Sequence, residues 1–455
     1  MAAEIDEPVT PAGRLFLQPQ IDQVINCAMA SEHEIPLDSI KPEIQNSLLL
    51  VHPKFRSLMV RDSVGREYWR RTEVDVDRHL IFIHRRLSED PSVSDEDAVN
   101  DYLADLSNSS PLPADKPLWE IHILVAHKSA VFRVHHALGD GVYLMAMLLS
   151  FCRRIDDPSQ TPSIRGVDTS SFMPRRWTVP TLVKIVWFTV IYVLEIALRI
   201  LWRRDRRTAV SGGDGVELWP RKLATARFRL DDMKTVKRAV PNSTINDVLF
   251  GILSSGISRY LNIRSSKALK EGERITGATM VNLRQQYLSS LKDHHASTQH
   301  GNRFGVILLP IYYHGHGLNP LDSVKRAKAM IDKKKLSLEA LFTYVVSLLV
   351  TCFFGAKLTS IIDYRIFCNT TFTISNVAGP EEKMTLVGNV VKYIRATSSS
   401  LPHAITMHMV SYAGYADMQI LVAKDVIPDP KVLAKCFEDA LAEMKEAAES
   451  SCPKS

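Results

Sequence analysis

The spacing of apolar residues predicts alternating helices and strands in the first third of the chain. Apolar side chains recur at helical spacing over residues 37–49, and an almost wholly apolar helix is expected over 142–151. Short apolar runs typical of strands occupy residues 55–60, 121–126 and 130–134. Because helices and hairpins mix without a strict β-α-β repeat, the pattern predicts an α/β fold with mixed sheets.

The last half of the chain repeats this mixture of elements without a repeat in its sequence. A helix is expected over 244–261, and another over 431–447 carries one apolar stripe that favours core packing over a groove for a partner. Further strands are expected at 224–230, 275–281, 304–311, 371–375 and 420–423, and further helices at 323–333 and 338–354.

Between these regions the composition changes twice. Residues 155–180 are rich in Pro, Ser, Thr and Asp, as expected of a connecting arm, and the most hydrophobic stretch, 182–202, follows directly. Four arginines and a Gly-rich segment come next. We therefore divide the chain into an N-terminal half (1–175), a hydrophobic and basic linker (176–215) and a C-terminal half (216–455).

Composition excludes several classes of protein. The 455 residues are 45% hydrophobic and 23% charged, which is typical of globular domains. Six widely spaced cysteines form no C-x-x-C pair, so neither a zinc ribbon nor a secreted disulfide framework is expected. A net charge of +6 is too small to indicate nucleic-acid binding. The N-terminus lacks the pattern of a signal or transit peptide, so the chain is expected to start in the cytosol.

The most distinctive candidate chemistry lies between a predicted strand and the apolar helix that follows it, in the segment His135-His136-Ala-Leu-Gly-Asp140-Gly141. The strand brings two imidazoles to its end, and Asp140 can cap the helix. A neutral histidine can take a proton from a hydroxyl or a thiol. From the residues alone, a histidine pair with a purely structural role is an equal alternative.

Other polar clusters have ordinary structural explanations beside the functional ones. Trp119 follows Pro-Leu and suits packing better than ligand contact. Asn246 and Asp247 fit the first turn of a helix capped by Ser243 or Thr244, or a polar role at the site. A turn after a strand is the favoured explanation of Ser375-Asn376, with a role at the site as the alternative.

Two further sequence features limit the choice of chemistry. A second histidine cluster, at 293–316, has no metal-ligand spacing and is expected to be a surface loop, so no metal site is predicted. The chain also lacks a P-loop, a G-x-G-x-x-G after a strand and a G-x-S-x-G elbow. These absences argue against kinases, dehydrogenases and lipases.

The H-H-x-x-x-D-G segment resembles the active-site motif of the wax ester synthase/diacylglycerol acyltransferase family, in the CoA-dependent acyltransferase superfamily that includes chloramphenicol acetyltransferase. Ala378 stands where some relatives carry Pro, and the D-F-G-W-G block of soluble plant acyltransferases has no counterpart. Three further blocks resemble the family: Pro117–Trp119, Asn246–Leu249 and Ser375–Pro380. Another three resemble its plant branch: Thr10–Arg14, Val281–Arg284 and Gly301–Gly305.

The resemblance implies two pseudo-symmetric chloramphenicol-acetyltransferase-like halves with mixed sheets and a tunnel between them. It implies that His136 is the general base that activates a long-chain alcohol or diacylglycerol toward a fatty acyl-CoA. By the same resemblance His135 supports it, and Asp140 holds the motif in shape and points away from the substrate. The substrate-binding residues would be Gly141, Trp119, Asn246, Asp247, Arg284, Ser375 and Asn376.

No cofactor is expected, because acyl-CoA is a co-substrate. The tetrahedral oxyanion formed during acyl transfer would be stabilised by Asn246 or by Ser375 and Asn376. Two alternatives remain open. One is a soluble acyltransferase for a small alcohol or amine, and the other is a non-catalytic lipid-binding relative.

The hydrophobic stretch 182–202 is long enough to cross a bilayer. Glu195 near its middle opposes insertion, and a single span would place His136 on the other side of the membrane from Ser375. A helix lying in the membrane interface avoids both problems.

Lys184, Glu195, Arg199 and Arg203 fall near one helical face, which suits a helix in the plane of the interface. We therefore expect a monotopic enzyme on the cytosolic face of the endoplasmic reticulum, with the plasma membrane as a second location left open. A core helix of a soluble protein is the alternative.

Overall fold

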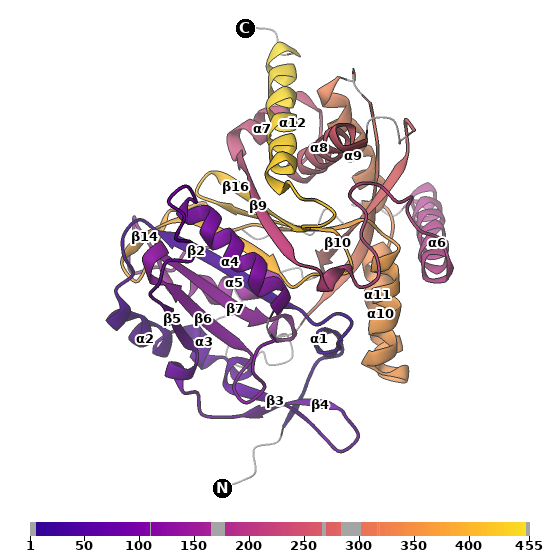
Figure 1. Ribbon diagram of the computed structural model, residues 1–455. Helices are drawn as coiled ribbons and strands as arrows, with labels where there is room; N and C mark the ends of the chain where they lie inside the picture. The colour runs from indigo at the N-terminus through magenta and orange to yellow at the C-terminus, as the bar shows by residue number, and fades with distance from the viewer. Residues whose placement is uncertain are drawn as a thin grey trace.

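The computed structural model describes residues 6–109, 111–164, 178–265, 270–283, 302–315, 317 and 319–451. Two mixed sheets with helices packed on them form the molecule (Figure 1). A small third sheet lies near the N-terminus and consists of β1 (Glu7–Pro8), β4 (Glu67–Arg71) and β3 (Ser57–Arg61).

The first large sheet has the strand order β5-β6-β7-β2-β14-β13-β8. Apart from the parallel pair β5–β6, its neighbouring strands are antiparallel. In sheet order the strands are β5 (Leu80–Ile83), β6 (Trp119–Leu124), β7 (Ser129–His135), β2 (Val24–Ser31), β14 (Asn389–Ser398), β13 (Met384–Leu386) and β8 (Cys152–Arg154).

The second large sheet has the order β11-β10-β12-β15-β16-β9, in which β10–β12 and β12–β15 are parallel. Its strands are β11 (Phe304–Tyr312), β10 (Arg274–Asn282), β12 (Phe372–Val377), β15 (Ile405–Tyr412), β16 (Tyr415–Ala423) and β9 (Arg221–Arg229). Both sheets are mixed, as the sequence predicted.

Each half of the sequence contributes elements that pair with or pack on the other half. Strands β13 and β14 come from the C-terminal part of the sequence but extend the N-terminal sheet, where β14 pairs with β2. In the other direction, Val99 and Leu103 of α4 (Asp95–Ser109) share a buried cluster with Leu223 of β9 and Leu421 of β16. A buried ion pair between Arg395 and Asp417, 2.8 Å long, adds to this contact. The halves therefore form one continuous body.

Helices pack on both sheets. The first half carries α1 (Pro11–Phe16), α2 (Leu37–Gln45), α3 (Leu48–Val51), α4 and α5 (Gly141–Leu149). The second carries α7 (Leu230–Ala239), α8 (Ile245–Ser265), α9 (Pro320–Lys335), α10 (Glu339–Phe354), α11 (Ala356–Cys368) and α12 (Pro430–Ser451), with α6 (Val179–Leu201) between the halves in sequence. Two helices, α2 and α3, replace the single helix expected over 37–49, because Asn46 and Ser47 interrupt it.

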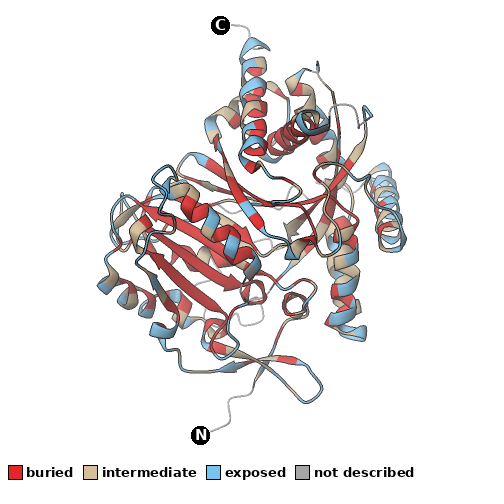
Figure 2. Ribbon diagram, in the orientation of Figure 1, coloured by how far each residue is buried: buried red, intermediate tan, exposed pale blue. Residues whose placement is uncertain are grey.

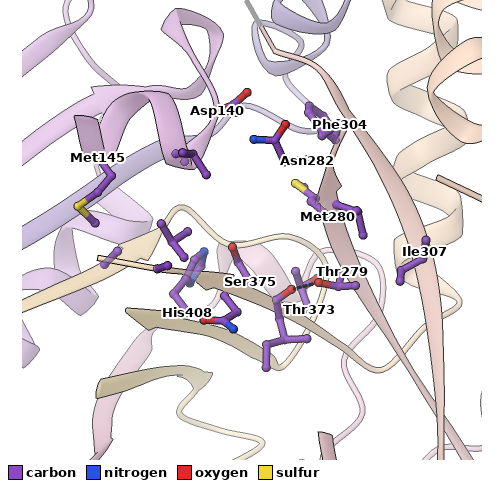
Figure 3. Close-up of a pocket in the computed structure, with 18 of the residues that line it drawn as sticks. Asp140, Met145, Thr279, Met280, Asn282, Phe304, Ile307, Thr373, Ser375 and His408 are labelled. Carbon is purple, nitrogen blue, oxygen red and sulfur yellow. Dashed lines mark hydrogen bonds between the residues drawn. The ribbon is translucent and has the colours of Figure 1, made fainter. Parts of the chain in front are cut away.

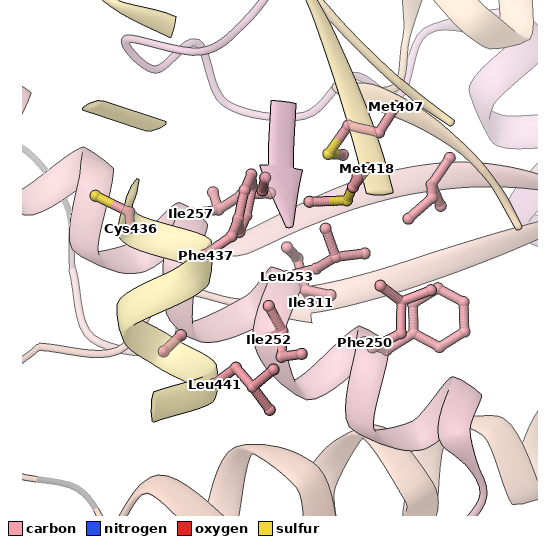
Figure 4. Close-up of a cluster of buried hydrophobic side chains, with 14 of the residues drawn as sticks. Phe250, Ile252, Leu253, Ile257, Ile311, Met407, Met418, Cys436, Phe437 and Leu441 are labelled. Atoms are coloured by element: carbon pink, nitrogen blue, oxygen red, sulfur yellow. The ribbon is translucent and has the colours of Figure 1, made fainter. Parts of the chain in front are cut away.

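The larger of the two main cores lies between the second sheet and the helices α8, α9 and α12 (Figure 4). Phe250 and Leu253 of α8 and Phe437 of α12 are among its members, together with Met407 and Met418 from the sheet. The apolar stripe of α12 is therefore core, as its spacing predicted.

The hydrophobic segment forms the single helix α6, and among the described residues it is the one continuous helix long and apolar enough to cross a membrane. Glu195 and Arg199 lie on the side of α6 that meets the protein, so they do not face water. Arg199 is buried and bonds to Glu195 and Asp205, and Glu195 also pairs with Arg274 of β10. This ion-pair network fixes the polar side of α6 to the protein, so its apolar side is left exposed (Figure 2).

Candidate active site

The turn that follows β7 is built by local hydrogen bonds. The chain leaves the strand at His135, makes one tight turn over His136–Leu138 and enters α5 at Gly141. Asp140 caps that helix, since its Oδ1 accepts a bond from the amide of Tyr143 at 3.1 Å. The sequence prediction of a capping aspartate is confirmed, and the cap sets the direction in which α5 leaves the turn.

His135 stiffens the turn. Its Nδ1 accepts a hydrogen bond from the amide of Ala137 at 3.1 Å, so Nε2 carries the proton and donates it to Asp22 at 2.8 Å. The ring is buried and is not among the residues that line the cavity described below. His135 therefore contacts the turn and Asp22 and lies behind the cavity wall.

His136 is held through its backbone. Its amide donates to the carbonyl of Gln23 at 2.8 Å, and its carbonyl accepts from Asn302 at 2.8 Å. The ring stacks on Phe16 of α1 at a centroid distance of 4.0 Å, and Phe304 of β11 lies 6.4 Å away. Three distant segments thus fix one imidazole.

The close packing of α1 on the turn depends on Gly13. A Cβ atom there would lie 3.0 Å from the Thr10 hydroxyl and 3.2 Å from the carbonyl of Ala137, which is tighter than ordinary contact. Glycine lets α1 approach the turn and place Phe16 against His136. The segment Thr10–Arg14 therefore helps to position His136, which the sequence analysis did not predict.

A cavity of about 1320 Å³ runs between the two halves (Figure 3). His136 is one of the residues that line it. Asp140 and Gly141 also line it from the N-terminal side, so Asp140 is closer to the substrate space than expected. From the C-terminal side the lining includes Asn246, Val281, Asn282, Leu283, Thr279, Thr373, Ser375, Asn376, Thr406 and His408, among many apolar side chains.

Three of the predicted binding residues meet in this wall. Asn246 at the start of α8 accepts a hydrogen bond from the Asn376 amide at 2.8 Å. Ser375 is the neighbour of Asn376 on β12 and lines the same space. The structure thus brings together residues that are far apart in the sequence.

Two other predicted residues lie elsewhere. Trp119 is fully buried, stacks on His79 at 3.8 Å and donates from Nε1 to the carbonyl of Phe55 at 3.0 Å. Asp247 is also fully buried and accepts bonds from the amide and hydroxyl of Thr244, at 2.7 and 2.9 Å. Neither lines the cavity, so the structure gives Trp119 a packing role and Asp247 a capping role.

Part of the predicted site cannot be placed. Arg284 lies outside the described residues, although Leu283 directly before it lines the cavity. Most of the second histidine cluster is also outside them. His314 is described and pairs with Glu271, away from the cavity lining.

Burial sets the charge of the two imidazoles in the cavity. It lowers the pKa of His136 to about 4, and it lowers that of His408 to about 4 with a further contribution from the nearby His136. Neither Nδ1 atom has a hydrogen-bond partner among the described residues. Both rings are therefore neutral at cytosolic pH and can exchange protons or hydrogen bonds with a substrate.

His408 was missed because its strand, β15, was not predicted. The structure places it opposite Ser375 on the neighbouring parallel strand β12, and this register cannot be read from the sequence.

Comparison with known proteins decides the family. The wax ester synthase/diacylglycerol acyltransferase catalytic domain matches residues 43–249, and the C-terminal domain of the same family matches 300–445. The chain belongs to this family. The resemblance found in the sequence is therefore confirmed, and so is the enzyme class, an acyltransferase.

Plant relatives of this family match nearly the whole chain. Wax ester synthase/diacylglycerol acyltransferase 11 of Arabidopsis thaliana is 32% identical, with 97% of this chain and 95% of the relative covered. Wax ester synthase/diacylglycerol acyltransferase 2 of the same plant is 33% identical, with 98% and 96% covered.

Solved structures confirm the predicted fold. The wax ester synthase/diacylglycerol acyltransferase from Marinobacter aquaeolei VT8 superposes with a TM-score of 0.60 at 18% identity, covering 97% of this chain and 100% of the other. The first condensation domain of the calcium-dependent antibiotic synthetase gives 0.58 at 13% identity, covering 99% and 98%. The chain therefore has the two-half fold of these structures.

Proposed function

We propose that this protein transfers a fatty acyl group from acyl-CoA to the hydroxyl of a long-chain alcohol or of diacylglycerol. The observation that carries the proposal is a neutral, backbone-anchored His136 on the wall of a large, mostly apolar cavity shared by the two halves. Family membership and the names of the Arabidopsis relatives support the same chemistry. Acyl-CoA enters as a co-substrate, and no cofactor is proposed.

His136 would act as the general base. A nitrogen of its neutral ring takes the hydroxyl proton while the oxygen attacks the thioester carbonyl, and a tetrahedral oxyanion forms. When that intermediate collapses, the C–S bond breaks and the thiolate of coenzyme A takes the proton from the imidazolium. The products are an ester and free coenzyme A. The ring is regenerated, so no acyl-enzyme is required.

Donors for the oxyanion lie on the facing wall. The Asn376 amide already donates to Asn246, which leaves the Ser375 hydroxyl and the remaining amide hydrogens available. His408 adds a ring N–H, because a neutral imidazole carries one. We propose Ser375 and His408 as the principal donors, since their backbones pair in register and both side chains line the cavity.

Cavity size favours long acyl and alkyl chains over a small acceptor. Pockets for small molecules usually measure about 300–1,000 Å³, and this one is about 1320 Å³. A small alcohol or amine would leave much of the apolar lining uncovered. The soluble alternative is therefore the weaker one.

We also propose that α6 lies in the interface of a membrane, on the cytosolic face of the endoplasmic reticulum. Its buried residues Ile185, Tyr192 and Arg199 face the protein, and Trp187 and Val190 are among its exposed apolar side chains. Protease protection of microsomes tests this, since tags at both chain ends should be cleaved without detergent. Protection of either tag in sealed microsomes would contradict the in-plane placement.

Ester formation by the purified protein tests the function. Palmitoyl-CoA is supplied with hexadecanol, with diacylglycerol and with a short-chain amine in parallel. We expect ester with at least one lipid acceptor and release of coenzyme A in equal amount. Product from the amine alone would favour the small-acceptor alternative, and no product from any of them would favour a lipid-binding relative.

A further inference from the structure

Three helices that contact one another form an unusually apolar side of the molecule. They are α6, α10 and α11, which line the same edge (Figure 1). More than half of the large hydrophobic side chains that are exposed among the described residues lie on them. On α10 and α11 these side chains are Leu341, Val345, Val346, Leu349, Phe353, Phe354, Leu358 and Ile361. An apolar area shared by several helices indicates a binding surface.

Helix α10 carries a stripe that runs along this surface. Leu341, Val345, Leu349 and Phe353 are spaced four residues apart, so they follow one another on the same helical face. With about 1.5 Å of rise per residue the stripe is about 18 Å long. All four side chains are exposed, and Leu341 at the first end also lines the cavity. The stripe is thus continuous with the wall of the active site.

The other side of α10 is fixed to the protein, which prevents the stripe from turning inward. Gly305 of β11 permits this contact, because a Cβ atom there would lie 1.9 Å from the carbonyl of Ala340. The Thr343 hydroxyl accepts from the amide of Val306 at 2.9 Å and lies 3.1 Å from the carbonyl of the same residue. Tyr344, one position on, lines the cavity. Helix α10 therefore separates the cavity from the outside.

Positive charge borders the apolar surface. Exposed Arg203, Arg204 and Arg207 follow α6, Lys333 precedes α10, and Lys357 begins α11. Basic side chains around an apolar face suit a bilayer with anionic headgroups, because the stems reach past the lipid tails while the charges meet phosphate. A lysine at the α10–α11 turn also favours shallow insertion over a span.

We propose that the α6–α10–α11 surface lies on the bilayer and that the lipid acceptor enters the cavity along the stripe of α10, past Leu341. This inference rests on the proposed acyltransferase function and adds the route by which one substrate arrives.

Substitution at the end of the stripe tests the surface. Phe353 and Phe354 are 77% and 71% exposed and do not line the cavity. The double variant F353E/F354E should lower binding to vesicles of phosphatidylcholine and phosphatidylserine by about tenfold or more, because two aromatic side chains lose their burial in lipid. It should also lose hexadecanol esterification in vesicles, while esterification of a short soluble alcohol stays within about twofold of wild type, since the cavity is unchanged.

The control is V64E/I263E, which adds the same charges at side chains that are 74% and 60% exposed and lie on other elements. It should bind vesicles as wild type does. Equal vesicle binding by F353E/F354E and wild type would overturn the proposal. So would a dimer in solution that F353E/F354E converts to monomer, because the surface would then be an interface between two copies of this chain.

A second variant separates entry from binding. Leu341→Trp should leave vesicle binding unchanged and lower kcat/KM for hexadecanol in vesicles much more than for a short soluble alcohol. An equal effect on both acceptors would overturn the route. If wild-type protein makes no ester from either alcohol, the proposed function itself fails, and vesicle binding still reports on the surface independently.

Discussion

The two walls of the cavity are built in different ways. On the N-terminal side, His135, His136, Asp140 and Gly141 come from one short turn. Local bonds cap α5 and hold His135, and bonds to Asp22, Gln23 and Asn302 tie the turn to other segments. On the C-terminal side, Asn246, Ser375 and His408 come from a helix and two strands that meet through the pairing of a sheet. The wall that provides the base is thus specified by a motif, and the wall that receives the oxyanion is specified by the whole fold.

This difference extends to how each imidazole is held. His136 is anchored by its backbone amide and carbonyl and stacks on Phe16. His408 is placed by the register of β15 between β12 and β16. Substitutions in the turn should therefore affect the chemical step or the local cap, and substitutions in the opposite wall should affect how well the transition state fits.

The largest effect is expected for the base. His136→Ala should lower kcat by about 100- to 10,000-fold, the usual contribution of a general base, while far-UV circular dichroism stays that of the wild type. Exposed His33 supplies the control, and His33→Ala should have full activity. Acyl transfer by His136→Ala at near the wild-type rate would show that His136 is not the general base.

The facing wall should give the next largest effect. His408→Phe removes the ring N–H and should lower kcat by about 100-fold, as the loss of one oxyanion donor does elsewhere. His408→Gln keeps an N–H donor and should recover part of the loss. If Phe and Gln variants are equally slow with an unchanged KM, His408 shapes the wall without donating.

The helix cap in the turn should give a smaller, mixed effect. Asp140→Ala should lower the free energy of unfolding by about 0.5–2 kcal/mol and reduce activity, because α5 loses its cap. Asp140→Asn keeps a capping oxygen and should retain most of the stability. Thermal unfolding followed by circular dichroism measures both, and an unchanged melting temperature for the alanine variant would argue against the structural role.

The smallest effect is expected where sequence reasoning suggested a contact and the structure shows packing. Trp119→Phe removes the hydrogen bond to Phe55 and should cost about 1 kcal/mol of stability. KM for palmitoyl-CoA and for hexadecanol should not change. A clear rise in either KM at constant stability would place Trp119 in the binding site after all.

Sequence reasoning predicted the turn well because its structure depends on neighbouring residues. An aspartate before an apolar helix indicates a cap, and the structure confirms it. It missed β2, β14 and β15, in which buried polar residues such as Asn26, Arg395 and Thr406 interrupt the apolar pattern of a strand. Missing β15 meant missing His408.

Long-range packing explains the remaining differences. The position of Phe16 against His136 and the inward side of α6 both depend on contacts between segments far apart in the chain. The charged residues of α6 were correctly placed near one face, but the pairing partners of Glu195 and Arg199, Arg274 and Asp205, could not be inferred from helical spacing. A pattern identifies a face, and tertiary contacts decide what that face meets.

The pH dependence of catalysis tests the buried neutral base most directly. The quantity to measure is kcat/KM for hexadecanol at saturating palmitoyl-CoA, with activity checked again after return to neutral pH. An exposed histidine titrates at about 6.5, whereas burial lowers the pKa of His136 to about 4.

Between these two pH values the unfolded chain binds more protons than the folded one, so acid lowers stability there, and the return to neutral pH separates unfolding from titration. A buried, neutral His136 predicts a rate that stays level through pH ~6.5 and falls reversibly only well below it. A reversible fall centred at ~6.5 or above would show an exposed base and contradict the account.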